Sequence, residues 1–183
     1  VRYFLEDNEK EFFSIRGKNV EKAFLRSPVE FSYISSKYNL KRKHPILNKI
    51  KAHTGVDYAA PTGTPVRATG DGTISFRGNN GGYGKLIEIK HSEDYSTRYA
   101  HLSRYKKALE VGDKVFQGEI IGYVGRTGRA TGPHLHYEVI FNGEKINPMK
   151  MKLPSGKKLK GTSLNNFLAE KDRINNEISK IKN

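Results

Sequence analysis

The stretch LIEIKH at residues 86–91 alternates apolar and polar side chains, with Ile87 and Ile89 on one side and charged residues on the other. A period of two is typical of a β-strand with one buried face. Other short β-type runs lie between turns rich in Gly, Pro, Asn and Asp, and several of them alternate in the same way. They are 66–68, 72–77, 96–102, 114–116, 120–124 and 134–141. The pattern predicts an antiparallel, mainly β core.

Both ends of the chain differ from this core. Residues 1–27 contain short aromatic segments, which we interpret as N-terminal strands or the end of a preceding domain. These segments are Tyr3-Phe4, Phe12-Phe13 and Ala23-Phe24-Leu25. Residues 151–183 begin as a basic linker and continue with apolar residues at helical spacing, which predicts a C-terminal helix. Residues 28–150 are then the central domain.

The composition limits the partners of the protein. Its 183 residues are 36% hydrophobic and 28% charged, which disfavours extensive disorder, and no apolar run is long enough to span a bilayer. The net charge of +14 favours anionic wall or membrane surfaces. The basic residues are dispersed and carry no nucleic-acid fold signature, so we expect no nucleic-acid partner. The lack of cysteine excludes disulfides and thiolate metal sites.

A histidine and an aspartate lie four residues apart in His53-Thr54-Gly55-Val56-Asp57. The neighbouring Gly, Val, Tyr and Pro residues favour an extended segment, in which residues four apart face the same side. His53 and Asp57 are therefore expected to converge on one ion. Imidazole and carboxylate are suitable zinc ligands, and a catalytic zinc typically has three protein ligands and one open position.

A second cluster is His134-Leu135-His136 at the start of a predicted strand, where both imidazoles project from one face. Either histidine can complete the metal site by this geometry. The other one, together with His101 in the predicted strand 96–102, is then a candidate for proton transfer or charge stabilisation. Single histidines are more often structural, and we interpret His44 and His91 in that way.

These motifs resemble the lysostaphin-type, or LytM-type, family of zinc endopeptidases that cut bacterial cell walls. The resemblance runs from about Pro28 to Pro148. It is carried by the segments KHPIL at 43–47, AHTGVDYAAP at 52–61, GGYG at 81–84, RYAHLS at 98–103 and GPHLHYE at 132–138. It implies an antiparallel β-sheet groove of the LytM type, the duplicated-hybrid-motif architecture, with zinc at its floor.

The resemblance also implies a role for each candidate residue. His53, Asp57 and His136 match the zinc ligands, for one Zn²⁺ per chain, and His101 and His134 match the two catalytic histidines. We expect one of these two histidines to take a proton from the attacking water and the other to stabilise the oxyanion. The resemblance does not say which histidine has which role.

The expected function is hydrolysis of peptidoglycan peptide stems by a D,D-endopeptidase. Similarity to the Gram-negative branch implies the periplasm or cell envelope, the D-alanyl-diaminopimelate bond and an upstream inhibitory or wall-binding region in the full-length protein. Because the chain opens at Val1 without Met, we expect a processed protein or a fragment. Two alternatives stay open, a D,D-carboxypeptidase that trims terminal D-alanine with the same zinc site, and a non-catalytic wall-binding or amidase-activating module.

The loop 79–84 is rich in glycine and permits two interpretations, a simple hairpin turn or a close approach of the backbone to substrate. Tyr83, Tyr99 and Tyr137 likewise could line the groove, although aromatic residues in strands are usually packing residues.

Overall fold

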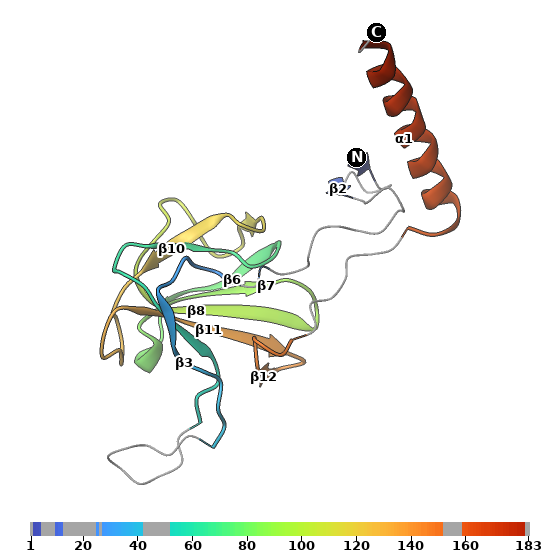
Figure 1. The fold of residues 1–183 in the computed structure, drawn as a ribbon. Helices are drawn as coiled ribbons and strands as arrows, with labels where there is room; N and C mark the ends of the chain where they lie inside the picture. The colour runs from blue at the N-terminus through green and yellow to red at the C-terminus, as the bar shows by residue number, and fades with distance from the viewer. Residues whose placement is uncertain are drawn as a thin grey trace. The chain divides into compact units, whose positions relative to one another are not determined.

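The computed structural model describes residues 2–4, 10–12, 25, 27–41, 52–151 and 159–181. The chain divides into two compact units. One is Phe24–Lys152, and the other joins Val1–Ala23 with Leu153–Asn183. Figure 1 shows the larger unit as a β-sheet structure and the smaller one with its long helix.

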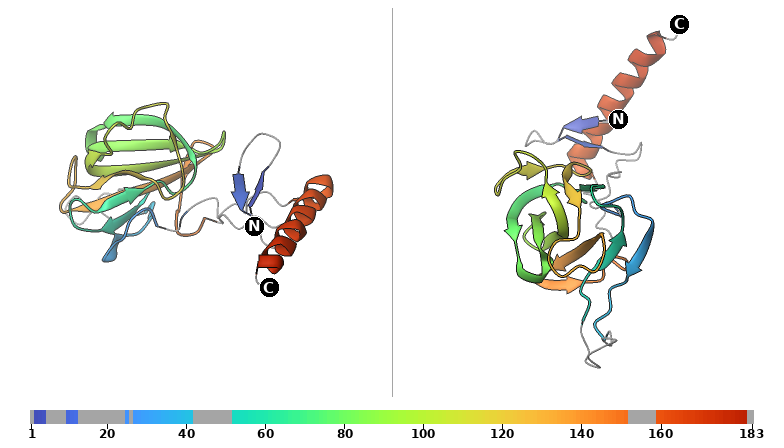
Figure 2. Two further views of the ribbon diagram at one scale, coloured as in Figure 1. Left: turned by 90° about the horizontal axis from the view of Figure 1, so that it is seen from above. Right: turned by 90° about the vertical axis from the view of Figure 1, so that its left-hand side faces the viewer.

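The larger unit is one twisted, antiparallel sheet of ten strands, which curls strongly in the right-hand view of Figure 2. The strands are β3 (Tyr33–Ser36), β4 (Val56–Ala59), β5 (Pro65–Arg67), β6 (Gly72–Asn79), β7 (Lys85–Lys90), β8 (Tyr95–Tyr105), β9 (Lys114–Val115), β10 (Ile120–Val124), β11 (His134–Phe141) and β12 (Glu144–Ile146). The main order is β3-β4-β11-β8-β7-β6-β9, with β10 beside β5 and β8, and β12 beside β11. The predicted mainly β, antiparallel fold is confirmed.

The predicted strands agree closely with this sheet. The runs 120–124 and 134–141 coincide with β10 and β11, and the other five overlap β5 to β9. Alternation does not predict β3 or β12, because these short strands are largely exposed and carry no clear buried face. β4 begins inside the segment that was expected to be extended.

Strand β11 lies in the middle of the sheet and separates two environments. It pairs with β4 over residues 134–137 and with β8 over residues 136–141. Leu135, Tyr137 and Val139 point into the hydrophobic core and are at most 2% exposed. The alternate residues His134, His136 and Glu138 therefore project from the opposite face of the strand.

The smaller unit contains β1 (Arg2–Phe4), β2 (Lys10–Phe12) and α1 (Gly161–Ile181). β1 and β2 pair antiparallel, which confirms strands at the first two aromatic segments; Phe13 and Ala23-Phe24 lie outside the described residues. Phe167 of α1 is completely buried in a small cluster with Leu159, Leu164 and Leu168. The helix at the C-terminal end is confirmed, and the three-part domain division stays a prediction.

No helix in the described part of the chain combines the length and the apolar character that crossing a bilayer requires.

Candidate metal centre

The sheet brings His53, Asp57 and His136 together. Asp57 in β4 lies directly opposite His136 in β11, and residues opposite each other in an antiparallel pair share a face. His53 precedes β4 and is held by two backbone hydrogen bonds with Asn39, of 2.8 and 2.9 Å. The three side chains therefore converge although the sequence separates them by up to 83 positions.

Their ligand atoms lie within 4.8 Å of one another. Asp57 Oδ1 is 3.0 Å from His53 Nε2 and 2.6 Å from His136 Nδ1, and the two ring nitrogens are 3.3 Å apart. Both histidines are buried, at 8% and 7% exposure. Two imidazole nitrogens and a carboxylate oxygen that face one point are a donor set that zinc prefers, so the residues fit a metal ion.

The second nitrogen of each ring is also engaged. His53 Nδ1 donates to the carbonyl of Lys37 at 2.9 Å, which leaves the lone pair of Nε2 directed at the centre. Burial raises the pKa of Asp57, but the adjacent imidazole groups of His136 and His53 outweigh it and hold the pKa well below its usual value. Burial lowers the pKa of His136, whereas Asp57 and Glu138 raise it to about 9. In the absence of a metal, a proton on His136 balances the two carboxylates.

His101 reaches the same centre through an irregularity of β8. Ala100 lies opposite His136, so regular alternation would turn His101 to the other face of the sheet. His101 instead has φ of 60°, and the register of β8 shifts against both β7 and β10 around this position. This bulge re-aims its side chain, so that the ring centroid lies 4.7 Å from that of His134 and 5.9 Å from that of His136.

The two additional histidines are held in the same way. His101 Nδ1 donates to the carbonyl of Thr127 at 2.7 Å, and His134 Nδ1 donates to the carbonyl of Gly132 at 2.8 Å. Each ring therefore has the lone pair of the neutral form on Nε2, and His134 Nε2 lies 3.9 Å from Asp57 Oδ1. Burial is the largest cause that lowers the pKa of His101, to about 4, so its ring is neutral near pH 7.

The loop that supports His101 depends on two glycines. Gly128 has φ of +72° and Gly84 has φ of +63°, a region that side chains rarely adopt. A Cβ atom on Gly128 would lie 2.4 Å from the backbone nitrogen of Gly84. Between them, Thr127 Oγ1 accepts from Lys85 N at 2.9 Å and donates to the carbonyl of Leu102 at 2.8 Å. This contact fixes the carbonyl that orients His101.

Glu138 continues the face of β11 that bears His134 and His136. It is completely buried, and its Oε1 accepts hydrogen bonds from four side chains. The donors are Thr54 Oγ1 at 2.6 Å, Tyr83 OH at 3.0 Å, His136 Nε2 at 3.1 Å and Lys145 Nζ at 3.1 Å. Burial raises the pKa of Glu138, but His136, Thr54 and Lys145 together lower it to about 2, so the carboxylate is ionised.

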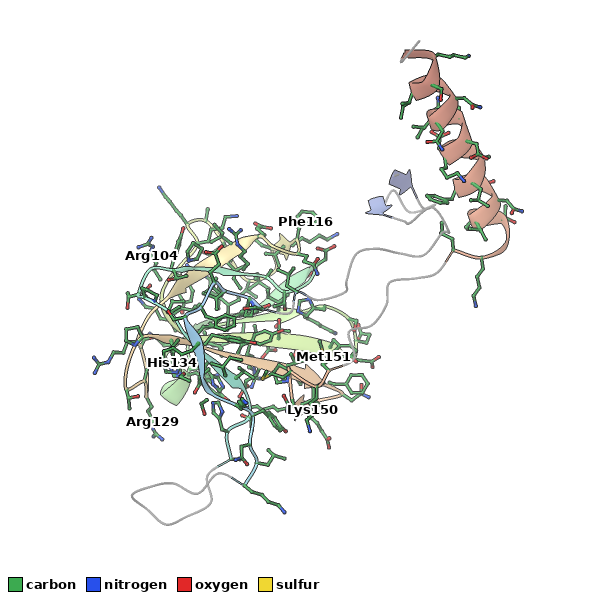
Figure 3. All side chains as sticks on the ribbon, in the orientation of Figure 1. Arg104, Phe116, Arg129, His134, Lys150 and Met151 are labelled. Carbon is green, nitrogen blue, oxygen red and sulfur yellow. The ribbon has the colours of Figure 1, made fainter. Side chains whose placement is uncertain are left out.

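A cavity of about 470 Å³ opens above these residues. It is lined by Ala52, His53, Thr54, Asp57, Asn80, Gly82, Tyr83, His101, Arg129, Thr131, His134 and His136. Figure 3 labels His134 and Arg129, which lie near one another at the same end of the sheet. The 3-10 helix η1 (Gly81–Tyr83) forms part of the wall, so the glycine-rich loop is both a turn and a part of the cavity.

All five site residues expected from the sequence therefore border one cavity, whereas His91 lies elsewhere. His91 donates from Nδ1 to the carbonyl of Asp71 and contacts Thr97 Oγ1, both at 2.7 Å. His44 lies outside the described residues. Of the three tyrosines, Tyr83 lines the cavity, while Tyr99 and Tyr137 are core residues whose hydroxyl groups hydrogen-bond with Thr69.

The sequence analysis missed Glu138 and Lys145. The signal for Glu138 was present, because it follows His136 by two residues in a strand and must share its face. Lys145 approaches from β12, so its position depends on the register of the β11–β12 hairpin, which no local pattern reveals.

Comparison with known proteins matches residues 51–148 to peptidase family M23. Peptidoglycan DD-endopeptidase ShyC of Vibrio cholerae serotype O1 is 44% identical over 165 residues, which cover 90% of this chain and 38% of that protein. DD-carboxypeptidase/endopeptidase Mpg of Neisseria meningitidis serogroup B is 51% identical over 128 residues, which cover 70% of this chain and 29% of that protein. The chain thus spans less than two-fifths of the length of these relatives.

Solved structures give the same fold. A zinc-containing peptidase from Vibrio cholerae superposes with a TM-score of 0.69 at 38% identity, over 84% of this chain and 47% of that one. The catalytic domain of lysostaphin from Staphylococcus simulans superposes with a TM-score of 0.57 at 33% identity, over 64% of this chain and 89% of that one.

Proposed function

The chain belongs to peptidase family M23, and from this membership we propose that it hydrolyses peptide crosslinks in bacterial peptidoglycan as a zinc-dependent endopeptidase. The observation that carries the proposal is the convergence of His53, Asp57 and His136 on one point, with His101 and His134 beside it. Such a set combines a three-ligand metal site with two groups able to move protons.

We assign the metal site to His53 Nε2, Asp57 Oδ1 and His136 Nδ1, for one zinc ion per chain. A zinc ion held there supplies a Lewis acid that polarises a carbonyl group and lowers the pKa of water to about 7. The two imidazoles and the carboxylate supply a net charge of −1, so the centre stays cationic with zinc and favours developing negative charge.

His101 and His134 are the proposed catalytic pair. Each keeps Nε2 toward the cavity, because its Nδ1 proton is held by a backbone carbonyl. One Nε2 would take the proton of the attacking water. The other ring would take part as the imidazolium, with a second proton on Nε2 that hydrogen-bonds to the oxyanion and is then delivered to the leaving amine. The short distance between the two rings, 4.7 Å, lets both act on one carbonyl carbon.

The proposed substrate is the peptide stem of crosslinked peptidoglycan, cut at the D-alanyl-diaminopimelate bond. ShyC is named a peptidoglycan DD-endopeptidase, which supports the endopeptidase assignment. Mpg is named a DD-carboxypeptidase/endopeptidase and is 51% identical, which supports a carboxypeptidase activity of the same site as the second candidate. A wall-binding or amidase-activating module without catalysis is less well supported, because the ligand and histidine set is complete.

We place this activity in the periplasm of a Gram-negative bacterium, with a role in wall remodelling and cell shape. The net charge of +14 suits contact with anionic wall polymers or a membrane surface, and nucleic acid is not a proposed partner. We also propose residues 28–150 as the peptidase domain, between the N-terminal strands and the basic linker with its helix. A regulatory region that covers the groove in a longer protein stays a prediction.

The decisive experiment incubates the protein with crosslinked diaminopimelate-type peptidoglycan, with and without a zinc chelator, and identifies the released muropeptides by mass spectrometry. Conversion of dimers to monomers that is abolished by the chelator and by His101→Ala supports the endopeptidase. Loss of terminal D-alanine alone supports the carboxypeptidase. No release of either product by the zinc-loaded protein would contradict both.

A further inference from the structure

Glu138 is a fully buried carboxylate next to the metal centre, and its four hydrogen-bond donors come from separate parts of the fold. Thr54 precedes β4, Tyr83 ends η1, His136 shares β11 with Glu138, and Lys145 lies in β12. All four donors meet at one oxygen, Oε1. The other oxygen, Oε2, has no hydrogen-bond partner within the described residues, and Arg98 Nη1 lies 3.9 Å from it.

The first consequence concerns the tautomer of His136. Thr54, Tyr83 and Lys145 all donate to Oε1, so this oxygen is an acceptor. Its contact with His136 at 3.1 Å therefore requires the proton of His136 on Nε2. The lone pair of Nδ1 is then available to a metal ion beside Asp57 and His53. Without an acceptor at this position, the neutral ring can carry its proton on Nδ1, and that tautomer cannot bind the metal.

The second consequence concerns the neighbours of the centre. Thr54 follows the ligand His53 directly in sequence and donates to Glu138 at 2.6 Å. Tyr83 lines the cavity and donates to the same oxygen at 3.0 Å. Lys145 contacts the hydroxyl groups of both, at 3.4 Å and 2.5 Å, and also balances the charge of the carboxylate. One buried atom therefore ties together both sides of the centre.

Stability alone gives a weak reason for this arrangement. A buried ion pair is often no more stabilising than well-packed apolar residues of similar volume, because both charges lose their hydration. Oε2 of Glu138, furthermore, accepts no hydrogen bond from the part of the chain that the structure describes. A buried carboxylate with these costs and with a contact to a proposed ligand fits a role in the metal centre.

We propose that Glu138 is a positioning residue that holds His136 with Nδ1 toward the metal and aligns Thr54 and Tyr83 around it, so that it sets the affinity for zinc. This inference rests on the proposed function, because it requires His136 to be a ligand. Lys145 is its partner, which makes the buried charge tolerable. Glu138 contacts no substrate in this scheme and acts through His136.

The test measures zinc affinity of the 183-residue chain by competition with a chromophoric chelator, and the absorption spectrum of the Co²⁺-substituted protein. Glu138→Met removes the acceptor at similar volume, whereas Glu138→Gln keeps an acceptor oxygen and loses the charge. Glu119→Gln is the matched control, because Glu119 forms an ion pair with Lys106 in the same unit and neither residue lines the cavity. Thermal unfolding of each metal-free variant reports the integrity of the fold.

We expect Glu138→Met to weaken zinc binding about 10- to 100-fold and to alter the Co²⁺ spectrum. Glu138→Gln should recover part of this loss, and Glu119→Gln should match the wild type. Wild-type zinc affinity in both Glu138 variants would overturn the inference and leave the proposed function intact. A loss explained entirely by unfolding of the metal-free protein, equal in both variants, would also overturn it. A wild-type chain that binds no zinc would remove the proposed function and the inference together.

Discussion

The substitution Gly128→Ala should impair catalysis, although Gly128 is neither a proposed metal ligand nor a proposed catalytic histidine. Its Cβ atom would lie 2.4 Å from Gly84 N and 2.5 Å from the carbonyl oxygen of Gly82, where an ordinary contact begins at 3.4 Å. The loop must therefore move by about 1 Å to accept the methyl group. Thr127 is the adjacent residue, and its carbonyl orients His101, so the displacement reaches the ring of His101.

The magnitude follows from two contributions. Alanine at positive φ costs about 1–2 kcal/mol wherever it occurs. A displacement of about 1 Å at a catalytic group costs about 10²-fold in rate. Gly118→Ala separates the two contributions, because Gly118 has φ of +84° and nothing lies within 4 Å of the position of its Cβ atom.

The assay compares kcat on crosslinked muropeptides with the melting temperature and zinc content of each variant. Both variants should lose some thermal stability, and only Gly128→Ala should lose turnover, by about 10²-fold, with its zinc retained. Equal kcat values for Gly128→Ala and Gly118→Ala would refute the argument that the contact between the two loops positions His101.

Three further predictions concern the ligands, the catalytic pair and the smaller unit. His53→Ala should lose both bound zinc and turnover, measured by metal analysis and muropeptide release. His101→Ala should retain zinc while kcat falls by about 10²- to 10⁴-fold, and loss of the metal would contradict the role given to His101. Phe167→Ala should destabilise the unit that contains α1 by about 3–5 kcal/mol, measured by urea unfolding, because Phe167 is completely buried.

Local pattern was sufficient for most of the sheet. β7 shows a period of two in the sequence over residues 87–90, whereas β10 is a short apolar run between turns. The edge strands β3 and β12 show neither pattern, because they are short and none of their side chains is fully buried. The grouping of β1, β2 and α1 in one unit joins the two ends of the chain, and no periodicity within either end predicts it.

The site shows the same division between local and long-range information. Spacing alone places His53 near Asp57 and puts His134 and His136 on one face. Alternation predicts the wrong face for His101, because the direction of its side chain depends on a bulge with φ of 60°. The resemblance to known peptidases, and not alternation, predicted His101 as a site residue. This bulge depends on the pairing of β8 with β7 and β10, which are separate in sequence, so no local pattern predicts it.

The central position of β11 in the sheet makes local unfolding of the metal centre rare. Hydrogen bonds to β4 and β8 hold this strand on both edges, so its amide protons should exchange with solvent only in the rarest and largest openings of the larger unit. The backbone amide of His136 is therefore expected to be among the last in the larger unit to exchange with solvent. Differences in substrate preference between related chains are more easily accommodated in the surrounding loops, such as those that carry Tyr83 and Arg129, where a change in length leaves the strand and its ligand in place.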